Sequence, residues 1–250
     1  MTQEIINQLK DDNEYYNGVG RQYLSNSDIG TLLNNPKEFG AKREDTKQFA
    51  MGRYFHQLFL EPNKAKEWDF IDVASRNTKK YKEYVAELSA NSSRPRDFAL
   101  LLKEKNEVEF WVEAMKTNLD FFDWIYAEDN KFEVPAVKEI CGEMWKGKAD
   151  IVGKDYLYDL KTSGSISDFK WNARKYNYDS QAYIYQELVG KPMVFLVIDK
   201  TSLTMGAFTV GQESLDRGRR KVERAVEVYR TFFGDNPTED INQFYFNEEI

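Results

Sequence analysis

Two carboxylates and a lysine lie close together in a stretch of strand-like sequence, and their types and spacing suit a hydrolytic site. The stretch is Gly147–Thr162, GKADIVGKDYLYDLKT, and it contains Asp150, Asp159 and Lys161. Side chains two positions apart on a strand point to the same face. Asp159 and Lys161 should therefore project together while Leu160 turns into the core. We expect a compact ionic site on one face of the strand.

A tight turn should bring the second carboxylate to the same place. Lys154 and Asp155 are typical of such a turn, so the strand with Asp150 is predicted to fold back against the next strand. Two converging, half-buried carboxylates need a positive partner, and a hard cation such as Mg²⁺ or Mn²⁺ is the usual one in hydrolases. Lys161 beside it could hold or deprotonate a water and offset phosphate charge, which suits phosphodiester hydrolysis. The alternative is a surface hairpin with solvated charges.

The composition bounds the class of protein without deciding its function. The chain has 250 residues, enough to bury a substantial core in one large domain. No apolar run approaches the roughly 20 residues of a membrane span, and the N-terminus lacks a signal-peptide pattern, so we expect a cytoplasmic protein without a membrane partner. Cys141 is the only cysteine, which excludes an intramolecular disulfide and a four-cysteine metal site. A metal here must rest on oxygen ligands, with one histidine at most.

The net charge of −7 argues against a polycation that coats nucleic acid without specificity. Local basic surfaces remain compatible with DNA binding, because carboxylates elsewhere can set the total. Such clusters are more often solvated helix faces, so their recurrence favours DNA binding only slightly. The clusters are Arg76, Lys79, Lys80 and Lys82; Arg94 and Arg96; Lys170, Arg174 and Lys175; and Arg217, Arg219, Arg220, Lys221 and Arg224.

The rest of the chain predicts helices first and then a sheet, because the hydrophobic period changes from helical to alternating after residue 130. His56, the only histidine, lies on a predicted helix. The expected elements are a flexible segment over 1–22; helices over about 28–34, 47–62, 77–88 and 95–118; strands over 131–140 and 144–152; a helix over about 167–189; strands over 192–200 and 202–210; and a helix over about 212–233.

This order of elements describes an α/β fold with a mixed central β-sheet, helices on both of its faces and a helical N-terminal part. No internal repeat or low-complexity linker divides the chain, so we expect one domain over 23–250. Within it we expect a helical part over about 23–125, a sheet-containing core over about 130–233 and a C-terminal tail over 234–250.

Taken in order, the motifs resemble those of the PD-(D/E)XK nucleases, and among them the exonuclease VIII (RecE-type) group of phage and prophage recombination exonucleases. The resemblance covers roughly residues 23–233 and implies the restriction-endonuclease-like core of that superfamily. Ala149 stands before Asp150 where the superfamily is named for a proline. The motifs that carry the resemblance are LSNSDIGTLLNNP, GRYFHQLFLEP, KGKADIV, YDLKT and QAYIY.

The resemblance implies a metal site. Asp150 and Asp159 would hold Mg²⁺, with Mn²⁺ as a substitute, helped by the carbonyl of Leu160. His56 would lie at the metal or at the scissile phosphate; taken alone, a single histidine is more often a partly buried ring with a hydrogen bond. Glu133 lies early in its strand, which can place it either in the same pocket or outside it.

The resemblance also implies the remaining catalytic residues and the activity. Lys161 would position the water, and Gln181 and Tyr185, one helical turn apart, would orient DNA or the lysine. The implied protein is a metal-dependent 5′-to-3′ exonuclease on duplex DNA ends, a ring-forming homo-oligomer that leaves single strands for an annealing protein. The alternatives are an endonuclease or single-strand nuclease on the same fold, or a catalytically idle phage DNA-binding or assembly protein.

Overall fold

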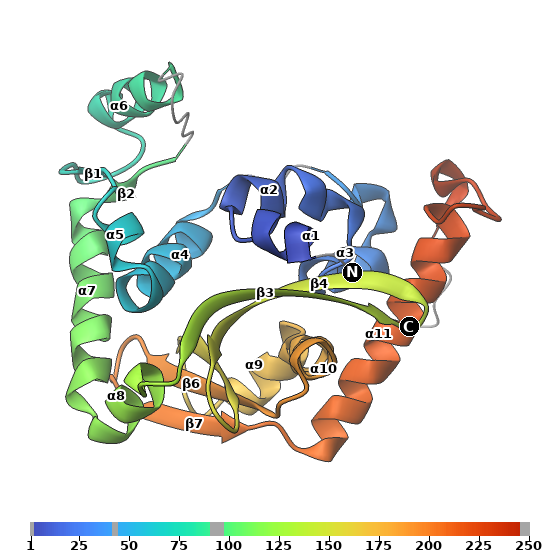
Figure 1. Ribbon diagram of the computed structural model, residues 1–250. Coiled ribbons are helices and arrows are strands. Elements are labelled where there is room, and N and C mark those ends of the chain that lie inside the picture. Colours follow the sequence, from blue (N-terminus) through green and yellow to red (C-terminus); the bar gives the residue numbers. More distant parts are fainter. Residues whose placement is uncertain (1–2, 42–44, 91–97, 246–250) are drawn as a thin grey trace.

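The computed structural model describes residues 3–41, 45–90 and 98–245 (Figure 1). Its first part is helical: α1 (Gln3–Gln8), α2 (Asp12–Tyr16), η1 (Val19–Gln22), α3 (Asn26–Asn34), η2 (Pro36–Glu38), α4 (Lys47–Leu60) and α5 (Pro62–Ala65). Next come β1 (Phe70–Ile71), α6 (Lys79–Ala90), β2 (Leu100–Leu101), α7 (Leu102–Thr117) and α8 (Leu119–Tyr126). The remainder comprises β3 (Lys131–Ile140), β4 (Glu143–Val152), β5 (Leu157–Ser163), α9 (Phe169–Lys175), α10 (Tyr178–Val189), β6 (Met193–Asp199), β7 (Met205–Thr209), α11 (Gln212–Phe232) and η3 (Ile241–Gln243).

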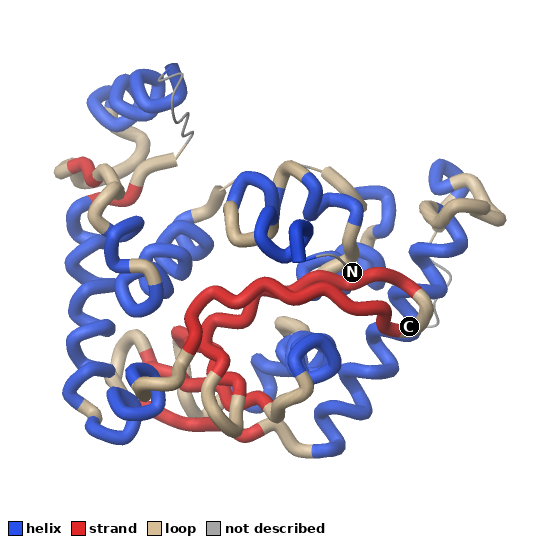
Figure 2. Tube along the Cα trace, in the orientation of Figure 1, coloured by secondary structure: helices blue, strands red, loops and turns tan. Residues whose placement is uncertain are grey.

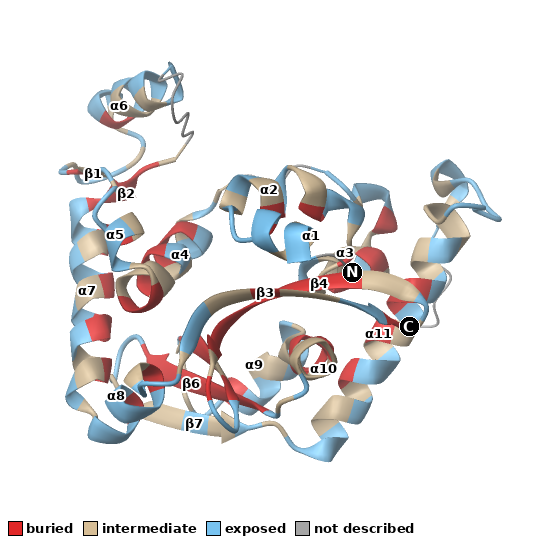
Figure 3. Cartoon of the chain, in the orientation of Figure 1, coloured by how far each residue is buried: buried red, intermediate tan, exposed pale blue. Residues whose placement is uncertain are grey.

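The main sheet has five strands in the order β3-β4-β5-β6-β7, and Figure 2 shows β3 and β4 arching over the rest. β5 and β6 are parallel, and the other neighbouring strands are antiparallel. The meander β3-β4-β5 has the predicted turns, and β6 is buried along its whole length (Figure 3). The predicted mixed sheet with flanking helices is therefore confirmed.

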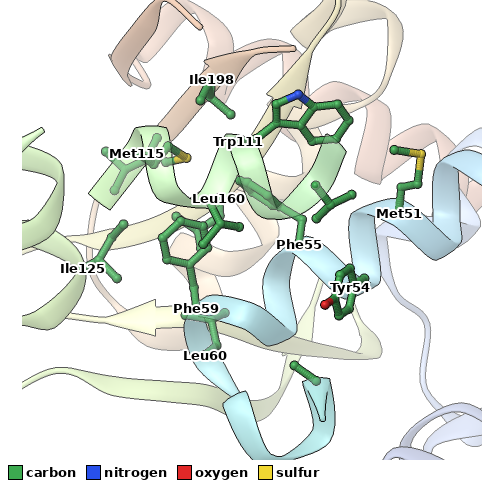
Figure 4. Close-up of a cluster of buried hydrophobic side chains, with 14 of the residues drawn as sticks. Met51, Tyr54, Phe55, Phe59, Leu60, Trp111, Met115, Ile125, Leu160 and Ile198 are labelled. Atoms are coloured by element: carbon green, nitrogen blue, oxygen red, sulfur yellow. The ribbon is translucent and has the colours of Figure 1, made fainter. Parts of the chain in front are cut away.

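Helices cover both faces of the sheet because β6 is apolar on both sides. Leu196 and Ile198 face a cluster that includes residues of α4, α7 and α8, whereas Phe195 and Val197 face α9 and α10. Successive side chains of a strand point to opposite faces, so this continuous apolar run needs a cover on each side. Figure 4 shows the first cluster, in which Phe55 and Phe59 of α4 pack near Leu160 of β5.

The N-terminal residues differ from the expected flexible segment. Residues 3–22 form two short α-helices and a 3-10 turn, and Leu9 and Tyr15 are buried. The helices lie beside β4, where Asp12 forms a 2.7 Å ion pair with Lys148. Leu24 also pairs with β4, since its N–H donates to the carbonyl of Met144 at 2.9 Å. The contacts that fix this segment are therefore tertiary, and its polar sequence does not reveal them.

Two predicted helices have different boundaries. The helix expected from about residue 95 begins at Leu102, because Leu100 and Leu101 pair with β1 as the short strand β2. Residues 95 and 96, with Arg94, lie outside the described residues. The helix expected over 167–189 is divided into α9 and α10 by Asn177, which has a φ of 59°. Within the described parts of the chain, no helix is long and apolar enough to cross a membrane.

Candidate active site

Three potential metal ligands from distant parts of the chain meet beside β4. His56 comes from α4, Glu133 from β3 and Asp150 from β4, and their ligand atoms all lie within 4.8 Å of one another. The His56 Nδ1 atom is 3.2 Å from Asp150 Oδ2. The position of His56 follows from α4, whose neighbouring residues Phe55 and Phe59 are buried in the core.

The strand register and a local distortion place Glu133 in this cluster. It falls opposite Asp150, between the paired residues Phe132–Ile151 and Val134–Ala149. Glu133 has a φ of 50°, in the left-handed region that residues other than glycine rarely adopt. Such a conformation costs roughly 1–3 kcal/mol and is found most often at functional sites. The structure thus places Glu133 beside His56 and Asp150, a position that the sequence left open.

The second part of the site is an ion pair on β5. Lys161 Nζ lies 2.5 Å from Asp159 Oδ2, and Gln181 Nε2 of α10 donates to Asp159 Oδ1 at 2.5 Å. These contacts confirm that Asp159 and Lys161 share a face of the strand, with the intervening Leu160 fully buried. The N–H of Leu160 donates to Asp150 Oδ2 at 2.9 Å and so joins the two parts of the site.

Tyr185 contacts the backbone of β4. Its hydroxyl accepts a hydrogen bond from the N–H of Lys148 at 3.4 Å. Gly147 allows this close packing, since a Cβ atom at that position would lie 3.1 Å from the Tyr185 ring and 2.6 Å from Leu188. Gln181 and Tyr185 therefore share one face of α10, as predicted, but only Gln181 contacts an ionisable group of the site. Their roles in orienting DNA or Lys161 stay predictions.

Burial and crowding shift the pKa values of the site. Burial raises the pKa of Glu133, and the nearby charge of Asp150 raises it further. Burial also raises the pKa of Asp159, against the opposing effect of Lys161. Although burial alone would raise the pKa of Asp150, His56, Lys161 and the Leu160 N–H hold it below the ordinary value. The pKa of Lys161 is raised despite burial, because Asp159 and Asp150 favour its charged form.

The donor set fits a hard divalent cation. Carboxylate oxygens are the ligands that Mg²⁺ and Mn²⁺ prefer, and one imidazole is compatible with such a site. Burial raises the pKa of Glu133 most, and the charge of Asp150 adds to the rise; a cation between the two carboxylates would offset both effects. Among the described residues, the cluster of potential metal ligands consists of His56, Glu133 and Asp150 and does not include Asp159. The oxygens of Asp159 contact Gln181 and Lys161 instead. The predicted use of Asp159 and of the Leu160 carbonyl as ligands stays a prediction.

Sequence reasoning missed two aromatic features near the site. Lys161 Nζ lies 5.0 Å from the ring centroid of Tyr178, a distance at which the ring face attracts a cation. Tyr178 is three residues before Gln181 on α10, and this helical spacing was the available signal. In addition, a groove of about 1140 Å³ runs beside the site and is lined by residues that include Tyr15, Tyr16, Tyr23, Lys146, Gln181 and Tyr185.

The mixed sheet with a carboxylate–lysine site on adjacent strands defines a PD-(D/E)XK type of protein. The family model of the PDDEXK-like domain of unknown function (DUF3799) matches residues 31–235. The chain belongs to this family. The resemblance to the PD-(D/E)XK superfamily that the motifs indicated is thereby confirmed, while the RecE-type group within it stays a prediction.

A solved structure of another protein has the same fold. The chain is similar to a crystal structure of a protein from Eubacterium rectale named "Putative exonuclease", with a TM-score of 0.64 and 17% sequence identity over 96% of this chain and 95% of that one. At this identity the likeness concerns the fold alone. The structure of a protein named SSO0001 has a TM-score of 0.33 and 16% identity, over 80% of this chain and 84% of that one, which is too low to support an argument. A search of curated protein sequences found no match.

Proposed function

We propose that this chain is a metal-dependent deoxyribonuclease that hydrolyses phosphodiester bonds. The observation that carries the proposal is the cluster of His56, Glu133 and Asp150, with ligand atoms within 4.8 Å, beside the ion pair of Asp159 and Lys161. A surface hairpin with solvated charges would not bury Asp150 and Asp159, nor place a glutamate where burial and a neighbouring carboxylate raise its pKa. Membership of the PDDEXK-like family supports the same reaction.

The residues of the cluster would hold Mg²⁺, with Mn²⁺ as a substitute. His56, Glu133 and Asp150 supply one imidazole nitrogen and two carboxylates, and Asp159 would join them if Lys161 moved toward the substrate. A bound cation would lower the pKa of water and stabilise the charge on the phosphate. The Leu160 N–H fixes one Asp150 oxygen, so that the carboxylate keeps its orientation before substrate binds.

Lys161 would act as a positive charge that stays on the amine throughout the reaction. Its pKa is raised by Asp159 and Asp150, so the amine stays protonated and is unsuited to remove a proton from water. A protonated amine can instead hold the attacking water or donate to a phosphate oxygen as negative charge develops there. Gln181 holds Asp159 from the other side, which limits the positions that the lysine can take.

The finer assignment is a 5′-to-3′ exonuclease on duplex DNA ends in phage or prophage recombination, in the cytoplasm of a bacterial host. It rests on the resemblance to the RecE-type exonucleases and agrees with the name given to the E. rectale protein of the same fold. A ring-shaped homo-oligomer and a single-strand annealing partner belong to this proposal as well. An endonuclease or single-strand nuclease on the same fold is the alternative, since the site sets the bond that is cleaved and not the preference for ends.

A cleavage assay tests the proposal. The substrate is a linear duplex with different labels on its 5′ and 3′ ends, compared with a closed circle, in Mg²⁺ and in a chelator. Loss of nucleotides from the 5′ ends alone, with the circle intact, would support the exonuclease. Cutting of the circle would favour the alternative, an endonuclease.

The controls in this assay are matched lysine variants. Lys161→Ala should be inactive, whereas Lys154→Ala, an exposed lysine in the turn between β4 and β5, should cleave like the wild type. Absence of cleavage of any DNA by the folded wild type would refute the nuclease and favour an idle binding protein.

A further inference from the structure

One segment outside the metal cluster combines cations with aromatic rings and contains no acidic residue between Asp168 and Asp179. The sequence of Phe169–Tyr178, FKWNARKYNY, covers α9 and the turn into α10, and we call it the α9 segment. Its cations Lys170, Arg174 and Lys175 are exposed, and none of them forms an ion pair with a carboxylate in the described parts of the chain. In a chain with a net charge of −7, such an acid-free segment favours an anionic partner.

The same segment exposes two large aromatic rings. Trp171 is 74% exposed and Tyr176 is 55% exposed. Large apolar rings are buried in most folds because exposure forfeits their hydrophobic stabilisation. Exposed rings interleaved with cations are typical of surfaces that bind unpaired nucleic acid, where bases stack on the rings and phosphates contact the cations.

A series of ring contacts connects this surface with the site. Lys161 Nζ lies 5.0 Å from the centroid of the Tyr178 ring, which in turn lies 6.1 Å from the centroid of the Tyr176 ring. Lys175 Nζ is 5.5 Å from the Tyr176 centroid. One ring therefore separates the exposed Tyr176 from the proposed catalytic lysine, so a strand that contacts the segment can continue into the site.

The backbone of the α9 segment is held in place by other elements. Asn177 adopts a φ of 59°, and its carbonyl accepts a 3.2 Å hydrogen bond from Asn26 of α3. Lys221 of α11 donates to the Asn177 side chain and to the Arg174 carbonyl, both at 2.8 Å. Phe169 is buried with its ring centroid 4.6 Å from that of Phe208. A partner would thus meet a preorganised backbone, which lowers the entropy lost on binding.

We propose that the α9 segment binds an unpaired stretch of the DNA strand next to the site of cleavage. Trp171 and Tyr176 stack on bases, while Lys170, Arg174 and Lys175 contact phosphates. The choice of an unpaired strand follows from the rings: bases within a duplex are already stacked on one another, so exposed rings gain nothing there, whereas cations alone would serve a duplex. The inference rests on the proposed function for the identity of the nucleic acid.

The test measures binding of labelled single-stranded oligothymidine and of a blunt duplex by fluorescence anisotropy in a chelator, so that no cleavage occurs. Stacking on one ring is worth roughly 5-fold to 150-fold in affinity. The double variant Trp171→Ala with Tyr176→Ala should therefore bind the single strand at least about tenfold more weakly. Phe110→Ala, at a ring that is 61% exposed on α7, is the matched control and should bind normally.

Further single variants separate the effect of stacking from effects on folding and on charge. Trp171→Phe keeps a flat ring and should restore much of the affinity that Trp171→Ala loses. The logarithm of single-strand affinity falls linearly with the logarithm of the salt concentration, and Arg174→Ala should make this slope shallower by about 0.7. Lys154→Ala, at the exposed lysine in the turn between β4 and β5, should leave the slope unchanged.

Each outcome decides something. Unchanged single-strand binding by the folded double variant would overturn the inference, as would equal weakening of single-strand and duplex binding or failure of the wild type to bind the single strand. Cleavage by the wild type is recorded separately. If the wild type cuts no DNA but loses single-strand binding when Trp171 is replaced, the nuclease is refuted and this inference stands. If the wild type cuts DNA and the double variant binds the single strand normally, the nuclease stands and this inference is refuted.

Discussion

Lys146 on β4 carries a buried charge that should reduce the stability of the folded protein near neutral pH. The residue is 6% exposed, and its amine donates to the carbonyl of Tyr15 at 2.5 Å. Burial lowers its pKa from 10.5 to about 8. In the unfolded chain Lys146 keeps its proton up to the ordinary pKa of 10.5, whereas in the folded protein it loses the proton near pH 8. The free energy of unfolding should therefore rise as the pH increases from about 8 to 10.5.

The magnitude follows from the two pKa values. Each pKa unit corresponds to about 1.4 kcal/mol, so the buried charge lowers the free energy of unfolding by ~3 kcal/mol at pH 7 and by only ~1 kcal/mol at pH 9.5. Lys146→Met removes this penalty but leaves the Tyr15 carbonyl without its donor, which costs roughly 1–3 kcal/mol at every pH. The wild type should therefore gain ~2 kcal/mol relative to the variant between pH 7 and pH 9.5.

The assay is urea unfolding of wild type and Lys146→Met at both pH values, in a chelator. Other groups that titrate in this interval are common to both proteins and cancel in the difference. Lys131→Met, at an exposed lysine of β3, is the control and should follow the wild type. Parallel pH profiles of wild type and Lys146→Met would contradict this prediction and show that the N-terminal helices do not bury this amine.

Three further changes test the core and the site. Glu104→Gln should lower the free energy of unfolding by roughly 3–5 kcal/mol in urea at pH 7, because it breaks a buried ion pair with Arg76 (2.5 Å). The pKa of Glu104 is lowered despite burial. The stabilisation by this ion pair is therefore present above pH 4.5 and should disappear at more acid pH. Burial and Asp150 raise the pKa of Glu133, so the stability of the metal-free wild type should fall as the pH rises above 4.5. Glu133→Gln should therefore raise the thermal stability of the metal-free protein at pH 8. Magnesium should stabilise the wild type more than the variant. His56→Gln should remain folded and lose cleavage by about 10-fold to 100-fold, as for a metal ligand or its support.

The results that contradict these predictions are distinct. A neutral Glu104→Gln would mean that α7 does not depend on the Arg76 contact. Equal stabilisation by magnesium of wild type and Glu133→Gln would place the cation away from Glu133. Loss of stability in His56→Gln, with normal cleavage per folded molecule, would make His56 a core residue.

Local patterns in the sequence were sufficient for much of the sheet and for half of the site. Alternation along β5 placed Asp159 and Lys161 on one face, and the turn after β4 brought Asp150 near them. Helical spacing placed Gln181 and Tyr185 on one face of α10. These features depend on strand and helix periods, which neighbouring residues express directly.

The features that the sequence did not reveal depend on distant contacts or on unusual backbone. The left-handed conformation of Glu133 has no signal in KFEVP, which reads as a regular strand. The break between α9 and α10 is stabilised by Asn26 and Lys221, far away in the chain. The N-terminal helices are fixed by ion pairs such as that of Asp12 with Lys148. Such contacts override local propensity.

The proposed function depends above all on a divalent cation that binds among His56, Glu133 and Asp150. The most direct test is anomalous diffraction at the manganese edge from crystals grown with Mn²⁺, for the wild type and for Asp150→Asn. We expect a strong peak bounded by these three side chains in the wild type and its loss in the variant. A peak elsewhere, or no peak at a saturating concentration of Mn²⁺, would contradict the proposed metal site.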